Sequence, residues 1–189
     1  MKAWLLPRLQ LLAGIAGVML VVQLGNSLSG QALNAWGVLP RHLGSLPGIL
    51  FAPWLHGSWL HLLGNLGGLL VLGWLLLLGR RRDFLEASAF IILGSGLLVW
   101  LLARPGLHIG ASGWLFGLWA LLLARAWFRR SWLDLLVALL VLFLLGGWVF
   151  GLLPRRGVSF EYHLAGALSG VLYAAWRYSP RQRRKRGEG

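Results

Sequence analysis

Residues 58–79 read SWLHLLGNLGGLLVLGWLLLLG, a run of leucine, glycine and tryptophan without an acidic residue, lysine or arginine. A helix needs about 20 mainly apolar residues to cross the hydrocarbon core of a bilayer, so this stretch predicts a transmembrane helix. The whole 189-residue chain fits that environment, because 58% of its residues are hydrophobic and only 12% are charged. We therefore expect an all-α, polytopic membrane protein rather than a soluble domain.

Five further apolar runs have a similar length. The six predicted spans cover residues 9–28, 58–79, 84–103, 111–128, 132–151 and 161–178. Six spans bring both termini to one side of the membrane, and fourteen of the 18 basic residues then lie on that side. Because Lys and Arg are enriched in cytoplasmic loops, we predict that both termini are cytoplasmic. The compact layout favours a bacterial cytoplasmic membrane.

The chain is predicted to form one domain over residues 1–189, with a helical core over about 9–178 and a basic cytoplasmic tail over about 179–189. The connection 29–57 is too apolar for a solvated loop and too rich in proline for a span, so we expect it to lie half-submerged on the outer face. The first span has no small-x-small cleavage site and is predicted to stay uncleaved.

The net charge of +13 would suggest nucleic acid as a partner in a soluble protein. Here the basic tail lacks aromatic residues between its charges, so we predict no nucleic-acid partner and an anchor beside anionic lipid instead. The absence of cysteine excludes disulfides, thiolate zinc sites and cysteine nucleophiles.

Four polar side chains lie where the hydrocarbon core makes them costly, and such residues are functional candidates. His61 and Asn65 share one face of the second span, Ser112 opens the fourth, and His163 lies one turn inside the sixth. These three spans run in the same direction, so the four side chains share one depth near the outer surface. We expect them to meet in a pocket that water can reach.

Glycines accompany these residues. Gly113 and Gly117 form a small-xxx-small pair on the fourth span, and Gly166 and Gly170 form another on the sixth. Such pairs let two helix backbones approach closely enough for a serine on one to bond a histidine on the other. Gly110 permits an unusual backbone beside Ser112.

Each feature alone also has a structural explanation. Small-xxx-small pairs occur widely in helix packing, and Ser112 could cap a helix or bond to the preceding turn. His56, at the membrane interface, fits a structural hydrogen-bonding role better than a catalytic one, and His42 and His108 lie in outer connections without a signal. Glu161 is two residues from His163, and such neighbours point apart on a helix.

Taken together, the chain resembles the rhomboid family of intramembrane serine proteases over about residues 36–178. HGSWLHLLGN (56–65) is similar to the family's histidine-then-HxxxN signature, GASGWLFG (110–117) to its GxSG motif, and FEYHLAGALSG (160–170) to its HxxGxxxG motif. The first loop lacks the Trp-Arg pair of many members. Tyr162 stands where alanine is common, which we expect to alter the pocket wall.

The resemblance implies a six-helix bundle in which Ser112 is the nucleophile and His163 its general base. It also implies that His61 and Asn65, with the Ser112 amide, stabilise the oxyanion, and that the substrates are single-span membrane proteins cut near the outer boundary. No acidic residue is placed to complete a triad, so we predict a Ser/His dyad oriented by helix packing. The two intramembrane histidines lie on different helices without a carboxylate or thiolate nearby, so we expect neither metal nor cofactor.

Two other functions remain open. A catalytically silent rhomboid-like protein could bind membrane clients, although the retention of Ser112 and His163 argues against it. A small transporter could use the same polar cluster, but it would predict paired broken helices or a repeat, and the sequence has neither.

Overall fold

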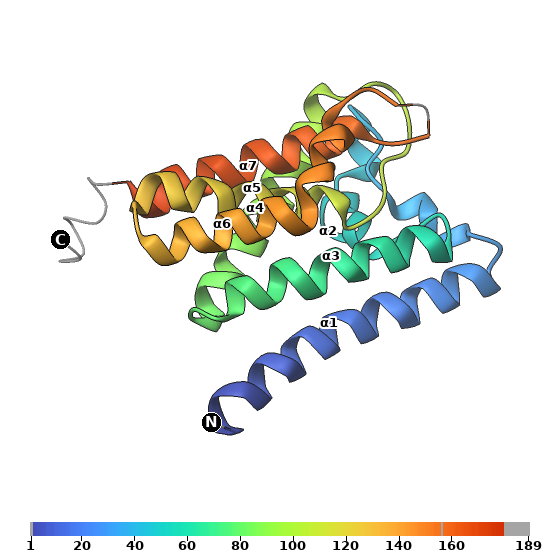
Figure 1. Cartoon of the computed structure of the whole chain (residues 1–189). Helices are drawn as coiled ribbons and strands as arrows, with labels where there is room; N and C mark the ends of the chain where they lie inside the picture. The colour runs from blue at the N-terminus through green and yellow to red at the C-terminus, as the bar shows by residue number, and fades with distance from the viewer. Residues whose placement is uncertain (1, 156, 180–189) are drawn as a thin grey trace.

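The computed structural model describes residues 2–155 and 157–179, and it confirms the all-α prediction (Figure 1). The α-helices are α1 (Lys2–Leu28), α2 (Gly48–Phe51), α3 (Trp59–Leu77), α4 (Arg81–Leu102), α5 (Ser112–Arg129), α6 (Trp132–Leu145) and α7 (Phe160–Tyr178). Shorter 3-10 helices are η1 (Ala32–Trp36), η2 (Leu43–Ser45), η3 (Ala52–Trp54) and η4 (Gly146–Leu152). The predicted basic tail lies, from residue 180 onward, outside the described residues.

Helical segments lie at all six predicted spans. Their ends differ from prediction by a few residues, except that α1 begins at Lys2 rather than near residue 9. The fifth segment also changes character, because α6 ends at Leu145 and the chain continues as the 3-10 helix η4. Gly146 and Gly147 stand at this break, where the backbone freedom of glycine disfavours a continuous α-helix.

Three of the long helices begin after a serine whose hydroxyl caps the helix. Ser58 accepts a hydrogen bond from the amide of His61, Ser131 from that of Asp134, and Ser159 from that of Tyr162. Each bond satisfies an amide that has no partner within its own helix. These caps fix where α3, α6 and α7 start, and α3 and α7 bear three of the four polar residues singled out above.

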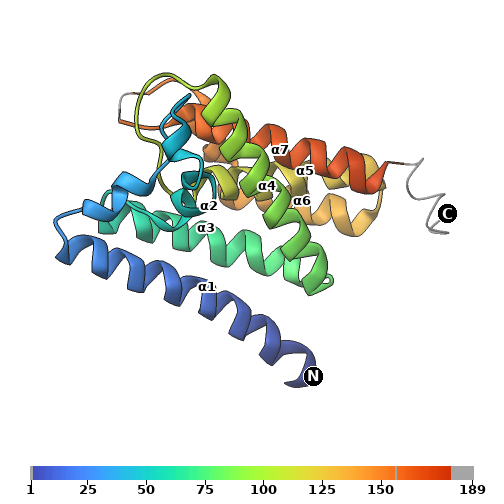
Figure 2. The same ribbon diagram turned by 180° about the vertical axis from the view of Figure 1, so that it is seen from behind.

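Helix α5 occupies the middle of the bundle and packs against α3, α4, α6 and α7. Its closest neighbour is α7: a Cβ at Gly166 would overlap the carbonyl of Gly113, and a Cβ at Gly170 would overlap that of Gly117. Only glycine allows this backbone contact, which brings the beginnings of α5 and α7 together. Helix α1 lies at the edge of the bundle, where it packs on α3 (Figures 1 and 2).

Within residues 2–155 and 157–179, four segments are long and apolar enough to cross a membrane: α1, α3, α4 and the combined segment Trp132–Leu152. Large apolar side chains cover the outside of the bundle, as on α6, where Phe143 is 86% exposed. Such a surface is suited to lipid rather than to water. The protein is therefore a multi-pass membrane protein, and α1 begins at the same end of the bundle where α7 ends (Figure 1).

The connection 29–57 folds into short helices at the opposite end of the bundle (Figure 2). Helix α2 packs against α4, and Val38 forms an isolated backbone bridge with His108 in the loop before α5. Arg41 donates hydrogen bonds from its side chain to the carbonyls of Leu101 and Ala103. The connection is thus tied to the segment that leads to Ser112.

Candidate active site

Ser112 and His163 form a hydrogen-bonded pair. Ser112 is the first residue of α5 and His163 lies in the first turn of α7, with 2.9 Å between Ser112 Oγ and His163 Nε2. The cap position of α5 is Ala111, which makes no side-chain cap bond. The Ser112 hydroxyl is directed to the imidazole of a neighbouring helix, so helix capping does not explain this serine.

The other ring nitrogen of His163 determines which tautomer the imidazole adopts. His163 Nδ1 lies 2.7 Å from the carbonyl oxygen of Gly151 in η4. Because a carbonyl oxygen can only accept, Nδ1 bears the proton and Nε2 is left as the acceptor for the Ser112 hydroxyl. The ring also stacks on Phe116, with centroids 4.1 Å apart and planes within 6° of parallel. A backbone carbonyl and an aromatic ring therefore orient the imidazole.

Glu161 takes no part in that orientation. Its carboxylate pairs with Arg104 at the start of the loop that follows α4. The acidic groups Asp83 and Asp134 pair with arginines at the far end of the bundle. Among the described residues, no carboxylate is paired with His163.

His61 and Asn65 lie beside Gly110, just before Ser112. A Cβ built on Gly110 would come within 2.7 Å of the His61 ring and 3.6 Å of Asn65 Nδ2. The Asn65 amide nitrogen is buried and makes no hydrogen bond within the protein, which leaves a donor available. Gly110 itself has a φ of +109°, a conformation that side chains disfavour.

One cavity of about 810 Å³ is lined by the four predicted side chains, Ser112, His163, His61 and Asn65. Its walls come from the start of α3, the loop before α5, the 3-10 helix η4 and the loop before α7. The cavity contains both polar donors and apolar surface, including Phe116 and Trp148. It has the size and mixed lining of a small-ligand or peptide site.

His56 packs against His61 next to the site. Its ring is fully buried and meets the His61 ring edge-on at 5.0 Å, while its carbonyl accepts a hydrogen bond from Asn26 of α1. Burial, followed by the neighbouring His61, lowers the pKa of His56 to about 4. His56 is therefore neutral at physiological pH.

Tyr162 lies outside the cavity, which corrects the expectation that it alters the pocket wall. Its ring is completely buried against Gly113, where a Cβ would overlap it, and it does not line the cavity. It packs with Val38, Ala52 and Val99 on the side of α4. The large ring thus fills space behind Ser112.

Three residues near the site escaped the sequence reasoning. Phe116 stands one helical turn after Ser112, and this spacing could have identified it. His108, dismissed as a loop residue, is buried with Nδ1 2.5 Å from the hydroxyl of Ser159, the cap of α7. The Gly151 carbonyl has no sequence signal, because any residue has a carbonyl.

Comparison with known proteins shows the family of the chain. Residues 44–180 match the model of the Rhomboid domain. The chain is 38% identical to the uncharacterized protein Rv1337 of Mycobacterium tuberculosis, with 97% of this chain and 80% of that protein covered. It is 36% identical to the uncharacterized protein ML1171 of Mycobacterium leprae, over 97% of this chain and 76% of that one. The domain match covers most of the chain and includes the helices that bring Ser112 and His163 together. This protein therefore belongs to the rhomboid family.

Proposed function

We propose that this protein is an intramembrane serine endopeptidase that cleaves single-span membrane proteins with a Ser112–His163 dyad. The observation that carries the proposal is the hydrogen bond from Ser112 Oγ to His163 Nε2, with Nδ1 protonated against Gly151. A serine becomes an effective nucleophile when an adjacent neutral imidazole can take its proton. This geometry supplies that base in the required tautomer.

The proposal includes six membrane spans. Helices α5 and α7 are not among the four segments that are long and apolar enough by composition alone, but α5 packs against α3, α4, α6 and α7, and α7 packs against α4 and α5. With six spans both termini are cytoplasmic and the cavity faces the outer side. The relatives named above are bacterial, which supports the cytoplasmic membrane of a bacterium as the location.

In the first step, Ser112 Oγ attacks the scissile carbonyl while His163 Nε2 takes its proton. The resulting imidazolium keeps its Nδ1 hydrogen bond to Gly151 and faces the ring of Phe116. A cation above an aromatic face is stabilised by about 0.5–2 kcal/mol. His163 then protonates the leaving amine, and general acid–base catalysis of this kind typically contributes ~10²–10⁴ in rate.

The oxyanion of the tetrahedral intermediate requires donors that are already in place. We assign this role to His61, to Asn65 Nδ2 and to the amide of Ser112. The first intrahelical bond of α5 runs from Leu115 N to Ala111 O, so the Ser112 amide precedes the bonded ladder. One oxyanion donor is typically worth about 10²–10³ in rate.

The second half of the reaction needs water and an open substrate backbone. A water molecule in the cavity gives its proton to His163 and attacks the acyl-serine, which releases the carboxylate product and restores the dyad. A helical substrate hides its carbonyls in hydrogen bonds, so segments weakened by glycine or proline near the cut should react fastest.

The decisive test is cleavage of a panel of single-span substrates in liposomes. We expect Ser112→Ala and His163→Ala to lower turnover by at least about 10³-fold. Ser169→Ala is the matched control, because Ser169 is a buried serine of α7 whose hydroxyl donates to Ala165 instead of to the site. His42→Ala, in the outer connection, is the control for loss of an imidazole.

A fluorophosphonate probe gives an independent reading of the nucleophile. Labelling should disappear in Ser112→Ala and persist in Ser169→Ala. Persistent labelling of Ser112→Ala would mean that another serine reacts. If the native protein neither cleaves any substrate nor takes the label, the dyad is inactive and a client-binding role replaces this proposal.

A further inference from the structure

The loop between α4 and α5, residues 103–111, meets the start of α7 through a second contact between a histidine and a serine. His108 is 6% exposed, and its Nδ1 atom lies 2.5 Å from Oγ of Ser159. Its Nε2 atom lies 3.3 Å from the carbonyl oxygen of Arg104 in the same loop. The chemistry proposed above gives this buried imidazole no task.

The two contacts of His108 determine its tautomer. Because the carbonyl of Arg104 can only accept, Nε2 bears the proton and Nδ1 accepts the hydroxyl proton of Ser159. The same hydroxyl oxygen accepts from the amide of Tyr162 as the cap of α7. A neutral imidazole thus satisfies both of its nitrogens and joins the loop to the first residue before α7.

The main chain of His108 is fixed on its other side. Its amide donates to the carbonyl of Val38 at 2.9 Å, and its carbonyl accepts from the amide of Val38 at 3.0 Å. Two residues later, the amide of Gly110 donates to the carbonyl of Ala52 at 2.8 Å. The loop is therefore held against the connection 29–57, and the side chain of His108 extends this support to α7.

Ser159 is connected to the candidate general base within one turn of α7. Its carbonyl oxygen accepts from the amide of His163 at 3.3 Å. A salt bridge runs beside the His108 contact, because Arg104 pairs with Glu161 in the same turn. Two neighbouring contacts thus join the loop that leads into α5 to the turn that bears the imidazole of the dyad.

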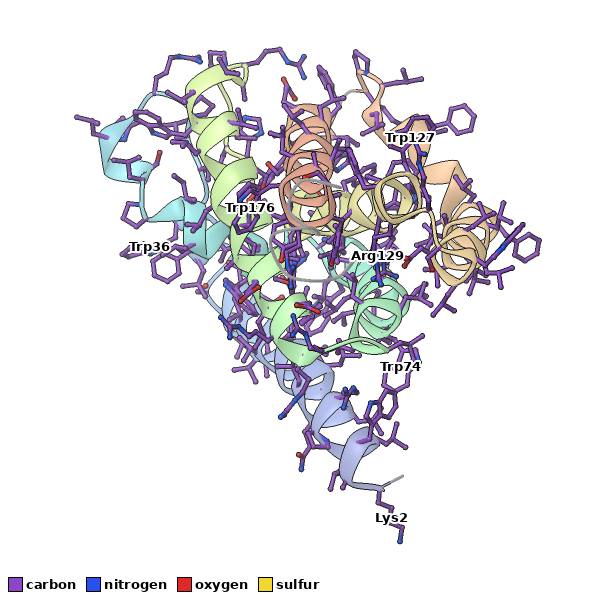
Figure 3. All side chains as sticks on the ribbon, turned by 90° about the vertical axis from the view of Figure 1, so that its left-hand side faces the viewer. Lys2, Trp36, Trp74, Trp127, Arg129 and Trp176 are labelled. Atoms are coloured by element: carbon purple, nitrogen blue, oxygen red, sulfur yellow. The ribbon has the colours of Figure 1, made fainter. Side chains whose placement is uncertain are left out.

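The dyad lies between two places where these segments are held together. One is the backbone contact of Gly113 with Gly166, and the other is the contact of His108 with Ser159 before both helices begin. Figure 3 looks onto the opposite end of the bundle, where α5 ends at Arg129, so the glycine contact lies between that end and the dyad. Two helices held at one place can still pivot there, whereas contacts on both sides of the dyad fix the distance from the serine hydroxyl to the imidazole.

We propose that His108 is a positioning residue of the candidate active site: through Ser159 it holds the loop before α5 and the start of α7 at the separation that the hydrogen bond of the dyad requires. His108 does not line the cavity of the dyad, so it acts through these segments and not on the substrate. The expected effect on turnover rests on the proposed function, whereas the effect on the geometry of the dyad does not.

The first measurement is kcat and KM of the full-length protein on one single-span substrate in liposomes. A displacement of about 1 Å in a catalytic arrangement typically costs on the order of 10²-fold, and the glycine contact limits the movement, so we expect His108→Ala to lower kcat by about tenfold. KM should stay nearly unchanged, because the loss concerns the transition state and not substrate binding. His42→Ala is the matched control, since it removes an exposed imidazole from the outer connection.

Two further variants separate positioning from a general loss of stability. His108→Asn should recover most of the rate, because its amide places a polar atom where Nδ1 stands and can still bond the Ser159 hydroxyl. If His108 acts through Ser159, the double variant His108→Ala/Ser159→Ala should be no slower than the slower of the two single variants. Independent, additive losses of rate would contradict the route through Ser159.

The second measurement reads the geometry of the dyad without turnover. Nitrogen-15 NMR of the protein labelled in its imidazoles distinguishes a hydrogen-bonded Nε2 from a free one, and His163→Ala identifies the signals of His163. In His108→Ala the Nε2 signal of His163 should shift toward that of an unbonded imidazole, whereas in His42→Ala it should keep its native position. Melting temperatures in detergent show whether each variant is folded.

An unchanged Nε2 signal of His163 in a folded His108→Ala protein would overturn the proposal. If the native protein cleaves no substrate but the signal shifts in His108→Ala, the proposed function fails and the positioning role stands. If His108→Ala does not fold, His108→Gln is measured by the same criteria. Its amide can reach the Arg104 carbonyl in place of Nε2 but offers no atom at the position of Nδ1.

Discussion

Replacing Gly110 by alanine should damage the oxyanion pocket while leaving the Ser112–His163 pair in place. The new Cβ would lie 2.7 Å from both Cε1 and Nε2 of His61, whereas ordinary contacts begin at 3.4 Å. The imidazole would have to retreat by about 0.7 Å, the difference between these two distances. Asn65 Nδ2, at 3.6 Å from the same Cβ, is already at a normal distance and would stay.

The expected loss of rate follows from this displacement. A misplacement of about 1 Å in a catalytic arrangement can cost on the order of 10²-fold, and loss of one oxyanion donor costs about 10²–10³-fold. We therefore expect kcat to fall by about 10²-fold. The positive φ of Gly110 adds backbone strain of about 1–3 kcal/mol, which should lower the melting temperature but leave the protein folded.

The assay compares kcat and KM on one single-span substrate in liposomes, with the melting temperature measured in parallel. Gly67→Ala in α3 is the matched control, because a Cβ there meets nothing within 4 Å. A Gly110→Ala protein that is folded and cleaves at the native rate would refute the assignment of His61 as a donor. An equal loss in Gly67→Ala would point to a general effect of added side chains.

Two further predictions concern the groups around the site. Phe116→Leu keeps an apolar side chain but removes the ring stacked on His163. Because an aromatic pair is worth about 0.5–1.5 kcal/mol, we expect kcat to fall by up to about tenfold. An unchanged kcat together with an unchanged pH–rate profile would contradict the role given to this ring. His56, with its pKa lowered to about 4 from an ordinary value near 6.5, binds a proton more weakly in the folded state, so its contribution to stability decreases as the pH falls from 6.5 toward 4. Between pH 7 and pH 5 this costs about 2 kcal/mol. Thermal unfolding followed by tryptophan fluorescence should therefore show a weaker pH dependence in His56→Gln than in the native protein, and equal slopes would show that His56 is not responsible.

The sequence was sufficient to predict the helical segments, because spanning helices depend on local properties. Runs of leucine mark the segments by composition alone, and capping serines such as Ser58 and Ser159 stand at their starts. The break at Leu145 was missed because the segment 132–151 is apolar throughout, and hydropathy does not distinguish an α-helix from a 3-10 helix. Its two glycines were the signal that could have located the break.

The candidate site was predictable where its chemistry depends on side chains at a regular spacing. Ser112, His163, His61 and Asn65 stand in motifs that a reader can find, and matched helix direction predicts a shared depth. The orientation of the imidazole was not predictable in the same way. It depends on the carbonyl of Gly151, which approaches His163 only because η4 bends toward α7.

At the end of the bundle where the arginines lie, the sequence again predicts one part of the arrangement and the tertiary structure decides the other. Composition and the order of the loops predict that most arginines lie on one side of the membrane, and these are properties of the chain read in sequence. Only the packing of α4 against α7 brings Arg177 to Asp83, residues that are 94 positions apart. Local patterns determine which helices form and which residues they present, because hydrogen bonding and burial of a helix act over a few residues. The meeting of Ser112 with His163, and of Arg177 with Asp83, was decided by the tertiary structure, since it depends on distances of a few ångströms between helices.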